Sequence, residues 1–195
     1  MTAAASIAST ADPVNPLIPE GYLDARRRVV TVDGSRVELI RYERTDGHNT
    51  GLGGEHFSMV VGDGGRLKGF TRMELALADG KLPSREDAQD IAMRFLEQSA
   101  PDLLPTLEIS WIEPHDEALR VTRGGRSENI TLTGMKVKMR NTDDGRWFWV
   151  IVGADRKVMV FERDIVWVTF PGHRKTEKWL HDSWLAERGG FDKEN

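Results

Sequence analysis

One segment of this chain has the pattern of a helix, while the sequence on both sides of it has the pattern of strands. Ser84 is a suitable N-cap, and Asp87 three residues later completes a capping box. The apolar residues that follow recur at helical spacing and form one stripe: Ala88, Ile91, Ala92, Phe95 and Leu96. Pro101 ends the segment, because proline disfavours helical geometry in the residue before it. The sequence therefore predicts one main helix over about residues 84–99, with Ile91, Phe95 and Leu96 buried against a sheet.

The sequence before this helix predicts two hairpins. Asp33-Gly34 is a strong hairpin turn signal, and it separates apolar strand patterns at residues 29–32 and 37–42. A glycine-rich loop follows at 45–54. The next hairpin turns at 62–65, between two further strand patterns.

The sequence after the helix predicts a meander. A strand begins near residue 107 and is expected to end at Pro114, and a polar loop is expected around Gly124-Gly125. In the next strand Met135, Val137 and Met139 alternate with Lys136, Lys138 and Arg140, which predicts one buried and one solvated face. Residues 147–152 are apolar on both faces and predict a central strand. Strands at 158–161 and 164–170 complete the meander, and Pro171-Gly172 closes it.

The last segment, residues 173–190, predicts a short helix that stops at Gly189-Gly190 and folds back on the sheet. Its two tryptophans and two leucines are available for docking. The predicted fold class is α+β: an antiparallel β-sheet packed against one main helix, with a short C-terminal helix. We expect a flexible tail over residues 1–20 and a single domain over 21–190, with 21–80 and 81–190 as alternative structural halves.

Composition narrows the functional classes. The chain has 195 residues, a formal net charge of −4 and no cysteine, so disulfides and thiol catalysis are excluded. The mild acidity argues against a nucleic-acid partner, and no apolar run is long enough for a transmembrane segment. The N-terminal residues lack the charge and apolar run of a secretory signal. These features predict a cytoplasmic protein, or a periplasmic one if the true start lies upstream.

The stretch from residue 37 to residue 101 carries a family resemblance. A strand pair of the form G…F.V.V…G.L.G leads through a linker into a helix of the form S.EDA..IA..FL. The residues that match are Gly54, Phe57, Met59, Val61, Gly65, Leu67, Gly69, Ser84, Glu86, Asp87, Ala88, Ile91, Ala92, Phe95 and Leu96. In this the chain resembles the PepSY-like and thermolysin-type propeptide domains of bacterial proteins. The resemblance implies a helix on a curved antiparallel sheet, and a role in binding or inhibiting a protease or another protein rather than in catalysis.

Catalytic and cofactor motifs are absent from the sequence, which contains no G-x-S-x-G, H-E-x-x-H, P-loop or dinucleotide fingerprint. We therefore expect no cofactor and, more readily than an enzyme, a binding protein. His173, Glu177 and His181 follow each other at i, i+4 and i+8, so on a helix they would share one face and offer ligands to a divalent metal. The alternative is that they form the solvated side of the C-terminal helix.

The aromatic residues near the C-terminus are candidates for a binding surface. This set is Trp147, Trp149, Trp167, Trp179, His181 and Trp184. The alternative is an ordinary bulky core. Two functions stay open: a module that docks a protein partner, such as a peptidase, through a sheet edge or the Trp-rich end, and a carrier or enzyme for a small molecule. A closed cavity with two or more titratable groups would favour the second function.

Overall fold

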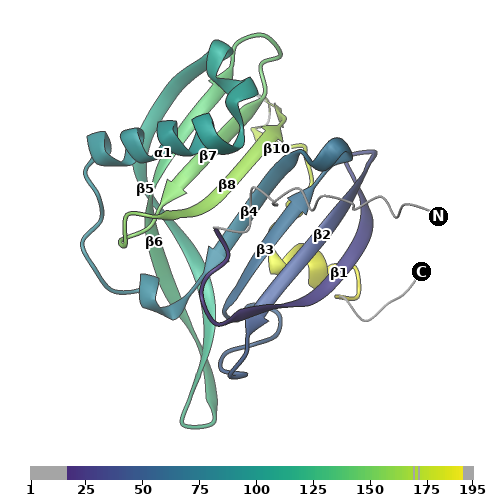
Figure 1. The fold of residues 1–195 in the computed structure, drawn as a ribbon, viewed down its shortest axis with the longest axis vertical. Coiled ribbons are helices and arrows are strands. Elements are labelled where there is room, and N and C mark those ends of the chain that lie inside the picture. The colour runs from purple at the N-terminus through teal and green to yellow at the C-terminus, as the bar shows by residue number, and fades with distance from the viewer. Residues whose placement is uncertain (1–16, 169, 171, 191–195) are drawn as a thin grey trace, which may run out of the picture.

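Eight antiparallel strands form a single sheet in the order β1-β2-β3-β4-β8-β7-β6-β5 (Figure 1). The structure, a computed structural model, describes residues 17–168, 170 and 172–190. The strands are β1 (Tyr22–Val32), β2 (Ser35–Arg44), β3 (His56–Val61), β4 (Leu67–Met73), β5 (Leu107–Arg123), β6 (Arg126–Asn141), β7 (Trp147–Val152) and β8 (Val158–Ile165). The sheet thus consists of two four-stranded meanders that join where β4 pairs with β8. The predicted α+β class with an antiparallel sheet is confirmed.

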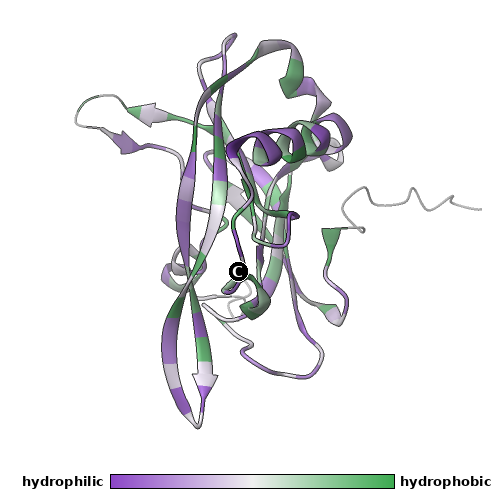
Figure 2. Ribbon diagram, turned by 90° about the vertical axis from the view of Figure 1, so that its left-hand side faces the viewer, coloured by the Kyte–Doolittle hydropathy of each residue, from purple (hydrophilic) through white to green (hydrophobic). Residues whose placement is uncertain are grey.

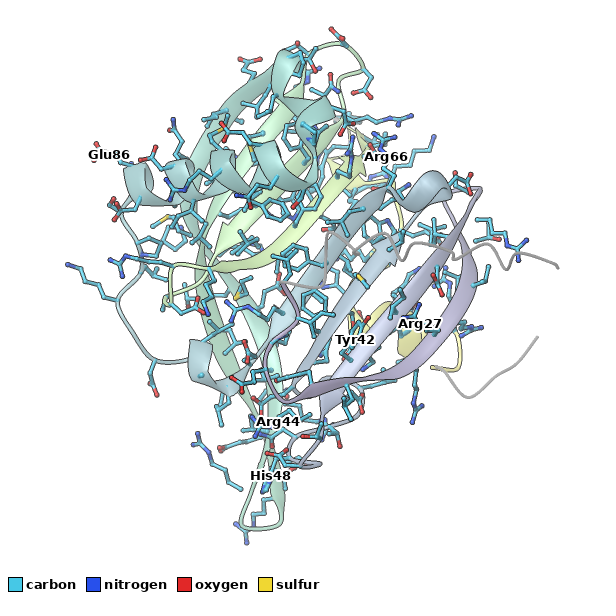
Figure 3. The ribbon with its side chains drawn as sticks, viewed as in Figure 1. Arg27, Tyr42, Arg44, His48, Arg66 and Glu86 are labelled. Atoms are coloured by element: carbon cyan, nitrogen blue, oxygen red, sulfur yellow. The ribbon has the colours of Figure 1, made fainter. Side chains whose placement is uncertain are left out.

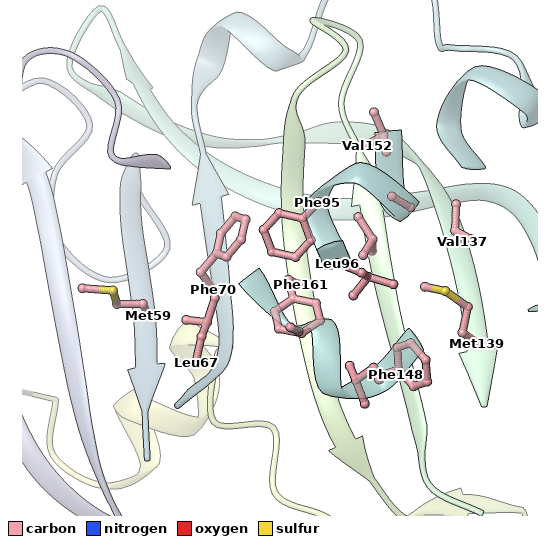
Figure 4. Close-up of a cluster of buried hydrophobic side chains, with 14 of the residues drawn as sticks. Met59, Leu67, Phe70, Phe95, Leu96, Val137, Met139, Phe148, Val152 and Phe161 are labelled. Atoms are coloured by element: carbon pink, nitrogen blue, oxygen red, sulfur yellow. The ribbon is translucent and has the colours of Figure 1, made fainter. Parts of the chain in front are cut away.

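The main helix, α1 (Arg85–Ser99), lies on one face of the β5–β8 half (Figure 1). The Ser84 hydroxyl accepts a hydrogen bond of 3.0 Å from the Asp87 amide, so the predicted N-cap is confirmed. Phe95 and Leu96 are buried as predicted, whereas Ile91 at the margin of the stripe is only half-buried. The Phe95 ring meets Phe70 and Phe161 edge-on, with centroid distances of 5.6 and 5.1 Å (Figure 4). This aromatic cluster is the centre of a first core between α1 and the sheet.

The predicted turns of the first meander are confirmed. Asp33 and Gly34 both have positive φ, which is the geometry of the tight turn between β1 and β2. A short 3-10 turn, η2 (Asp63–Gly65), connects β3 to β4. Another 3-10 turn, η3 (Leu75–Leu77), follows β4, and η4 (Pro101–Thr106) follows α1.

The second meander differs from the prediction at β5. The strand does not end at Pro114 but continues to Arg123, because β5 is an edge strand, where proline need not donate a hydrogen bond to a neighbour. The loop expected around Gly124-Gly125 is a tight turn at these two glycines, and the polar residues on both sides of it belong to the strands of a long hairpin. Its ribbon changes repeatedly between hydrophilic and hydrophobic residues (Figure 2).

The strand predicted at 164–170 is also wrong in its bounds. β8 already ends at Ile165, and a two-residue strand, β9 (Trp167–Val168), then pairs with β10 (His173–Arg174) in a separate small sheet. The predicted closing residue Pro171 lies outside the described residues, as do residues 1–16 of the expected tail. Leu17 and Ile18, at the described end of that tail, pack against the first core.

The C-terminal segment covers the sheet face opposite α1. Its helix, α2 (Asp182–Glu187), lies behind β2 and β3 in the view of Figure 1. The segment contributes four buried apolar residues to a second core: Trp179, Leu180, Trp184 and Leu185. Gly69 at the β4–β8 seam leaves space for it, since a Cβ there would lie 2.9 Å from Cζ3 of Trp179. The predicted docking is confirmed, although the helix begins at Asp182 rather than near 173.

Candidate functional site

A cavity of about 740 Å³ lies between the sheet and the C-terminal segment, on the face opposite α1. Strands β3 to β8 form its floor, and its other wall consists of Trp167 and of residues between Gly172 and Asp182. It lies beside the second core, but most of the side chains that line it are polar or ionisable.

Strand register explains why polar groups from distant parts of the sequence share this floor. Paired residues of neighbouring antiparallel strands lie on the same face of a sheet. Ser58 pairs with Thr71, Thr71 with Val160, and Val160 with Ile151. Ile151 in turn pairs with Lys136, so Thr71 and Lys136 lie in one row. Three strand spacings separate these two positions, which is roughly 14 Å.

Lys136 is buried in this row. Its side chain is 8% exposed, and its amine lies 4.0 Å from the centroid of the Trp149 ring. Burial lowers the pKa of Lys136 to about 8, and the opposing charges of Glu162 and Glu117 only partly restore it. The prediction of a solvated lysine face is therefore wrong at Lys136.

Lys138 is the next lysine on the same face of β6. It is half-buried, and its amine lies 4.4 Å from the centroid of the Trp147 ring and 5.5 Å from that of Trp167. Burial also lowers the pKa of Lys138. Trp147 thus belongs to the surroundings of Lys138 and does not line the cavity.

Two carboxylates in the cavity have cationic partners. Glu162 accepts a hydrogen bond of 2.5 Å from Arg174, which also donates to the carbonyl oxygen of Glu177 and so fixes the C-terminal segment on the sheet. The Glu117 carboxylate lies 3.4 Å from Nε2 of His115. Burial alone would raise the pKa of Glu117. The hydrogen bond from His115 and nearby positive charges together lower this pKa by a larger amount, so it lies below its usual range.

His56 is fully enclosed beneath the segment. Its Nδ1 lies 2.7 Å from the Gly54 carbonyl oxygen, and because a carbonyl only accepts, Nδ1 carries the proton. Burial lowers the pKa of His56 to about 4, so the ring is neutral at pH 7 and Nε2 is a hydrogen-bond acceptor. No described residue donates to this Nε2.

Two buried hydroxyls of the same row, those of Ser58 and Thr71, also have no hydrogen-bond partner among the described residues. Thr71 lines the cavity, whereas Ser58 lies next to it outside the lining. Buried polar atoms are almost always paired with protein, water or ligand. The floor therefore offers groups that a bound molecule would satisfy.

A network around Asp182 fixes the end of the cavity. Arg41, 1% exposed, donates a hydrogen bond of 2.7 Å to Asp182 and one of 2.8 Å to the Gly51 carbonyl oxygen. The Gly53 amide donates to the other oxygen of Asp182 at 2.5 Å. The first residue of α2 is thus tied to β2 and to the loop before β3.

The structure divides the predicted aromatic set. Trp149, Trp167 and His181 line the cavity. Trp179 is buried in the second core, and Trp184, also buried, lies at a separate hollow of about 510 Å³ beside Arg28 and Arg188. The arginines labelled in Figure 3 lie outside the cavity.

The spacing argument for a metal site is wrong, because no helix spans residues 173–181. His173 is in β10, Glu177 is in an irregular stretch, and His181 precedes α2. The Glu177 carboxylate instead pairs with Arg188. Within the described residues, no group of three His, Asp or Glu side chains is placed to hold a metal ion.

Sequence reasoning missed Lys136, His56 and Glu117 as cavity residues. Only the alternation in β6 gave a signal, since it placed Lys136 on the face opposite the first core. His56 showed no partner in the sequence, because Asp182, whose carboxylate lies 3.7 Å from Nδ1 of His56, is 126 positions away in a segment that folds back.

No family model matches the chain, and no curated protein or solved structure matches it. The function is therefore inferred from the geometry of the cavity. Among the described residues, no helix has the length and apolar character to cross a membrane.

Proposed function

We propose that this protein binds a small organic molecule in the cavity between the sheet and the C-terminal segment. The observation that supports this most directly is a cavity of about 740 Å³ whose floor holds buried polar groups without partners. Small-molecule sites have volumes of roughly 300–1,000 Å³ and combine apolar walls with a few polar groups.

The groups at the two ends of the floor define the ligand chemistry. At one end the Lys136 amine would donate to a carboxylate, phosphate or carbonyl oxygen. At the other end Nε2 of His56 requires a donor, such as a hydroxyl or an N–H group. Trp149 provides an apolar wall next to the amine. We infer an elongated, partly aromatic molecule with an oxygen acceptor at the Lys136 end.

Docking of a protein partner, as the propeptide-like resemblance implies, is a second proposal. The observation that favours it is the outer strand β1, where Leu23 and Val29 are 65% and 53% exposed. An edge strand with exposed apolar side chains can receive a partner strand. The Trp-rich end gives this proposal less support, because Trp179 and Trp184 are buried within the protein.

Binding of the dye 8-anilinonaphthalene-1-sulfonate, an aromatic anion, tests the cavity proposal. Lys178, in the C-terminal segment, lines the cavity and is exposed, so Lys178→Trp adds a bulky side chain at the cavity without disturbing a core. Lys175→Trp makes the same change of bulk and charge at an exposed position of the same segment outside the cavity. We expect Lys178→Trp to weaken dye binding at least about tenfold and Lys175→Trp to leave it unchanged.

Folding of both variants is checked by their far-UV circular dichroism and melting temperatures. Equal dye affinity of the wild type and a folded Lys178→Trp variant would contradict the proposal. The protein-docking proposal is tested separately, by Leu23→Lys and Val29→Lys, which should abolish capture of a partner without affecting dye binding.

A further inference from the structure

The Lys136 amine lacks the counter-ion that buried lysines normally have. The two carboxylates whose charge reaches it, Glu162 and Glu117, pair with Arg174 and His115 instead. No described carboxylate forms an ion pair with Lys136, and the nearest aromatic face is the Trp149 ring, 4.0 Å from the amine. A buried ammonium without a paired anion is unfavourable, which favours the neutral amine.

The neutral amine is a nucleophile, whereas the ammonium is not. Burial and the charges of Lys138 and Arg174 lower the pKa of Lys136 to about 8, against the attraction of Glu162 and Glu117. At pH 7 the neutral fraction is then roughly 300 times that of a lysine with an unshifted pKa. Because Lys136 lines the cavity, this nucleophile faces a space that a small molecule can enter.

We propose that the cavity captures a small carbonyl compound, best an aromatic aldehyde, and that Nζ of Lys136 condenses with it to an imine. This rests on the proposed function, since the aldehyde would occupy the same cavity. The aromatic preference follows from Trp149 and Trp167, which both line the cavity, so an aromatic ligand would contact indole rings there.

The condensation needs no oxidant or reductant. The amine lone pair attacks the carbonyl carbon, the C=O π electrons move to the oxygen, and that oxygen takes up a proton. The nitrogen then loses a proton, and the hydroxyl group takes one and leaves as water while the nitrogen lone pair forms the C=N bond. The resulting iminium loses its second N–H proton to give the imine, so the two protons taken up by the oxygen equal the two that the nitrogen releases. Glu117 and His115, 3.4 Å apart at the cavity wall, form an acid–base pair for these transfers.

Reductive trapping tests this directly. The full chain is incubated with 4-formylbenzoate and sodium cyanoborohydride, which reduces an imine to a stable secondary amine, and the modified lysines are identified by peptide mass mapping. We expect Lys136 to be labelled at least tenfold faster than any other lysine. The ratio of its labelling rate to that of exposed lysines should be largest near pH 7 and fall as the pH rises above 8, because the neutral fraction of Lys136 then levels off while theirs still increases.

Lys138→Arg is the matched control, because Lys138 is on the same face of β6 and also lies over tryptophan rings. Labelling at position 136 should persist in Lys138→Arg, and the fast phase should vanish in Lys136→Arg. Labelling spread over the lysines in order of their exposure would refute the inference. The peptide map of the wild-type protein alone distinguishes selective labelling of Lys136 from labelling in order of exposure.

The two proposals fail in different ways. If the dye binds in the cavity of the wild type but Lys136 is not selectively labelled, the imine is refuted while the small-molecule site stands. If neither occurs, both are refuted.

Discussion

Trp179→Ala should destabilise the protein strongly, although Trp179 is in the C-terminal segment. The side chain is 1% exposed in the second core, and Gly69 provides the space that its ring occupies at the β4–β8 seam. A buried tryptophan removes about 150–250 Å² from water. At about 25 cal/mol per Å² this corresponds to roughly 4–6 kcal/mol, and truncations of buried Trp to Ala cost about 3–5 kcal/mol. We expect a loss of about 4 kcal/mol in the free energy of unfolding.

The assay is equilibrium unfolding in urea, followed by far-UV circular dichroism so that the lost tryptophan does not affect the signal. Trp167→Ala is the matched control, because Trp167 is 46% exposed on the two-residue strand β9. We expect the control to lose less than about 1 kcal/mol. If Trp179→Ala loses no more than Trp167→Ala, the C-terminal segment does not stabilise the sheet, and the wall of the cavity is not a fixed part of the fold.

Three further substitutions test other parts of the structure. Phe95→Ala should lower the free energy of unfolding by about 3–5 kcal/mol in urea melts, and a loss below about 1 kcal/mol would show that α1 does not pack as described. Ser84→Ala should cost about 1 kcal/mol by the same assay, since it removes the acceptor for the Asp87 amide, and an unchanged midpoint would contradict this. His56 has a folded pKa of about 4, below its unfolded value, so the unfolded state binds the proton first as the pH falls. Stability should therefore decline between about pH 6.5 and pH 4, by on the order of 3 kcal/mol, and His56→Gln should flatten that decline whereas His48→Gln at an exposed site should not.

Local signals were enough to predict α1 and the first hairpin. The Ser84 cap acts within one helical turn, and the Asp33-Gly34 turn fixes the pairing of its two flanking strands. Neither depends on distant residues. The error at Pro114 has the opposite origin, since whether a strand lies at an edge or in the centre of a sheet is decided by the order of all strands. That order arises from pairing β4 with β8, which are separated by more than 80 residues.

The cavity could not be predicted for a related reason. Alternation in β6 predicts which side chains share a face, and it correctly separated Lys136 from Met135 and Val137. It does not show which segment covers the face that carries Lys136. The cover is the C-terminal segment, which is tied down by contacts such as that between Arg174 and Glu162, and these contacts follow only from the folded structure.

Two groups that line the cavity, Lys136 and His56, are unfavourable for stability alone, which is an argument for function. An apolar residue at position 136 would pack on Trp149 without the desolvation of an amine, and one at 56 would remove a buried acceptor that has no donor among the described residues. The same face shows that apolar packing is available, since Trp179 and Leu180 fill the adjoining second core. Polar groups that lower stability and share one cavity are typical of sites that bind or transform a ligand. One half of this sheet face is closely packed and holds the C-terminal segment in place. The other half is polar, and the segment covers it but leaves the cavity between itself and the sheet.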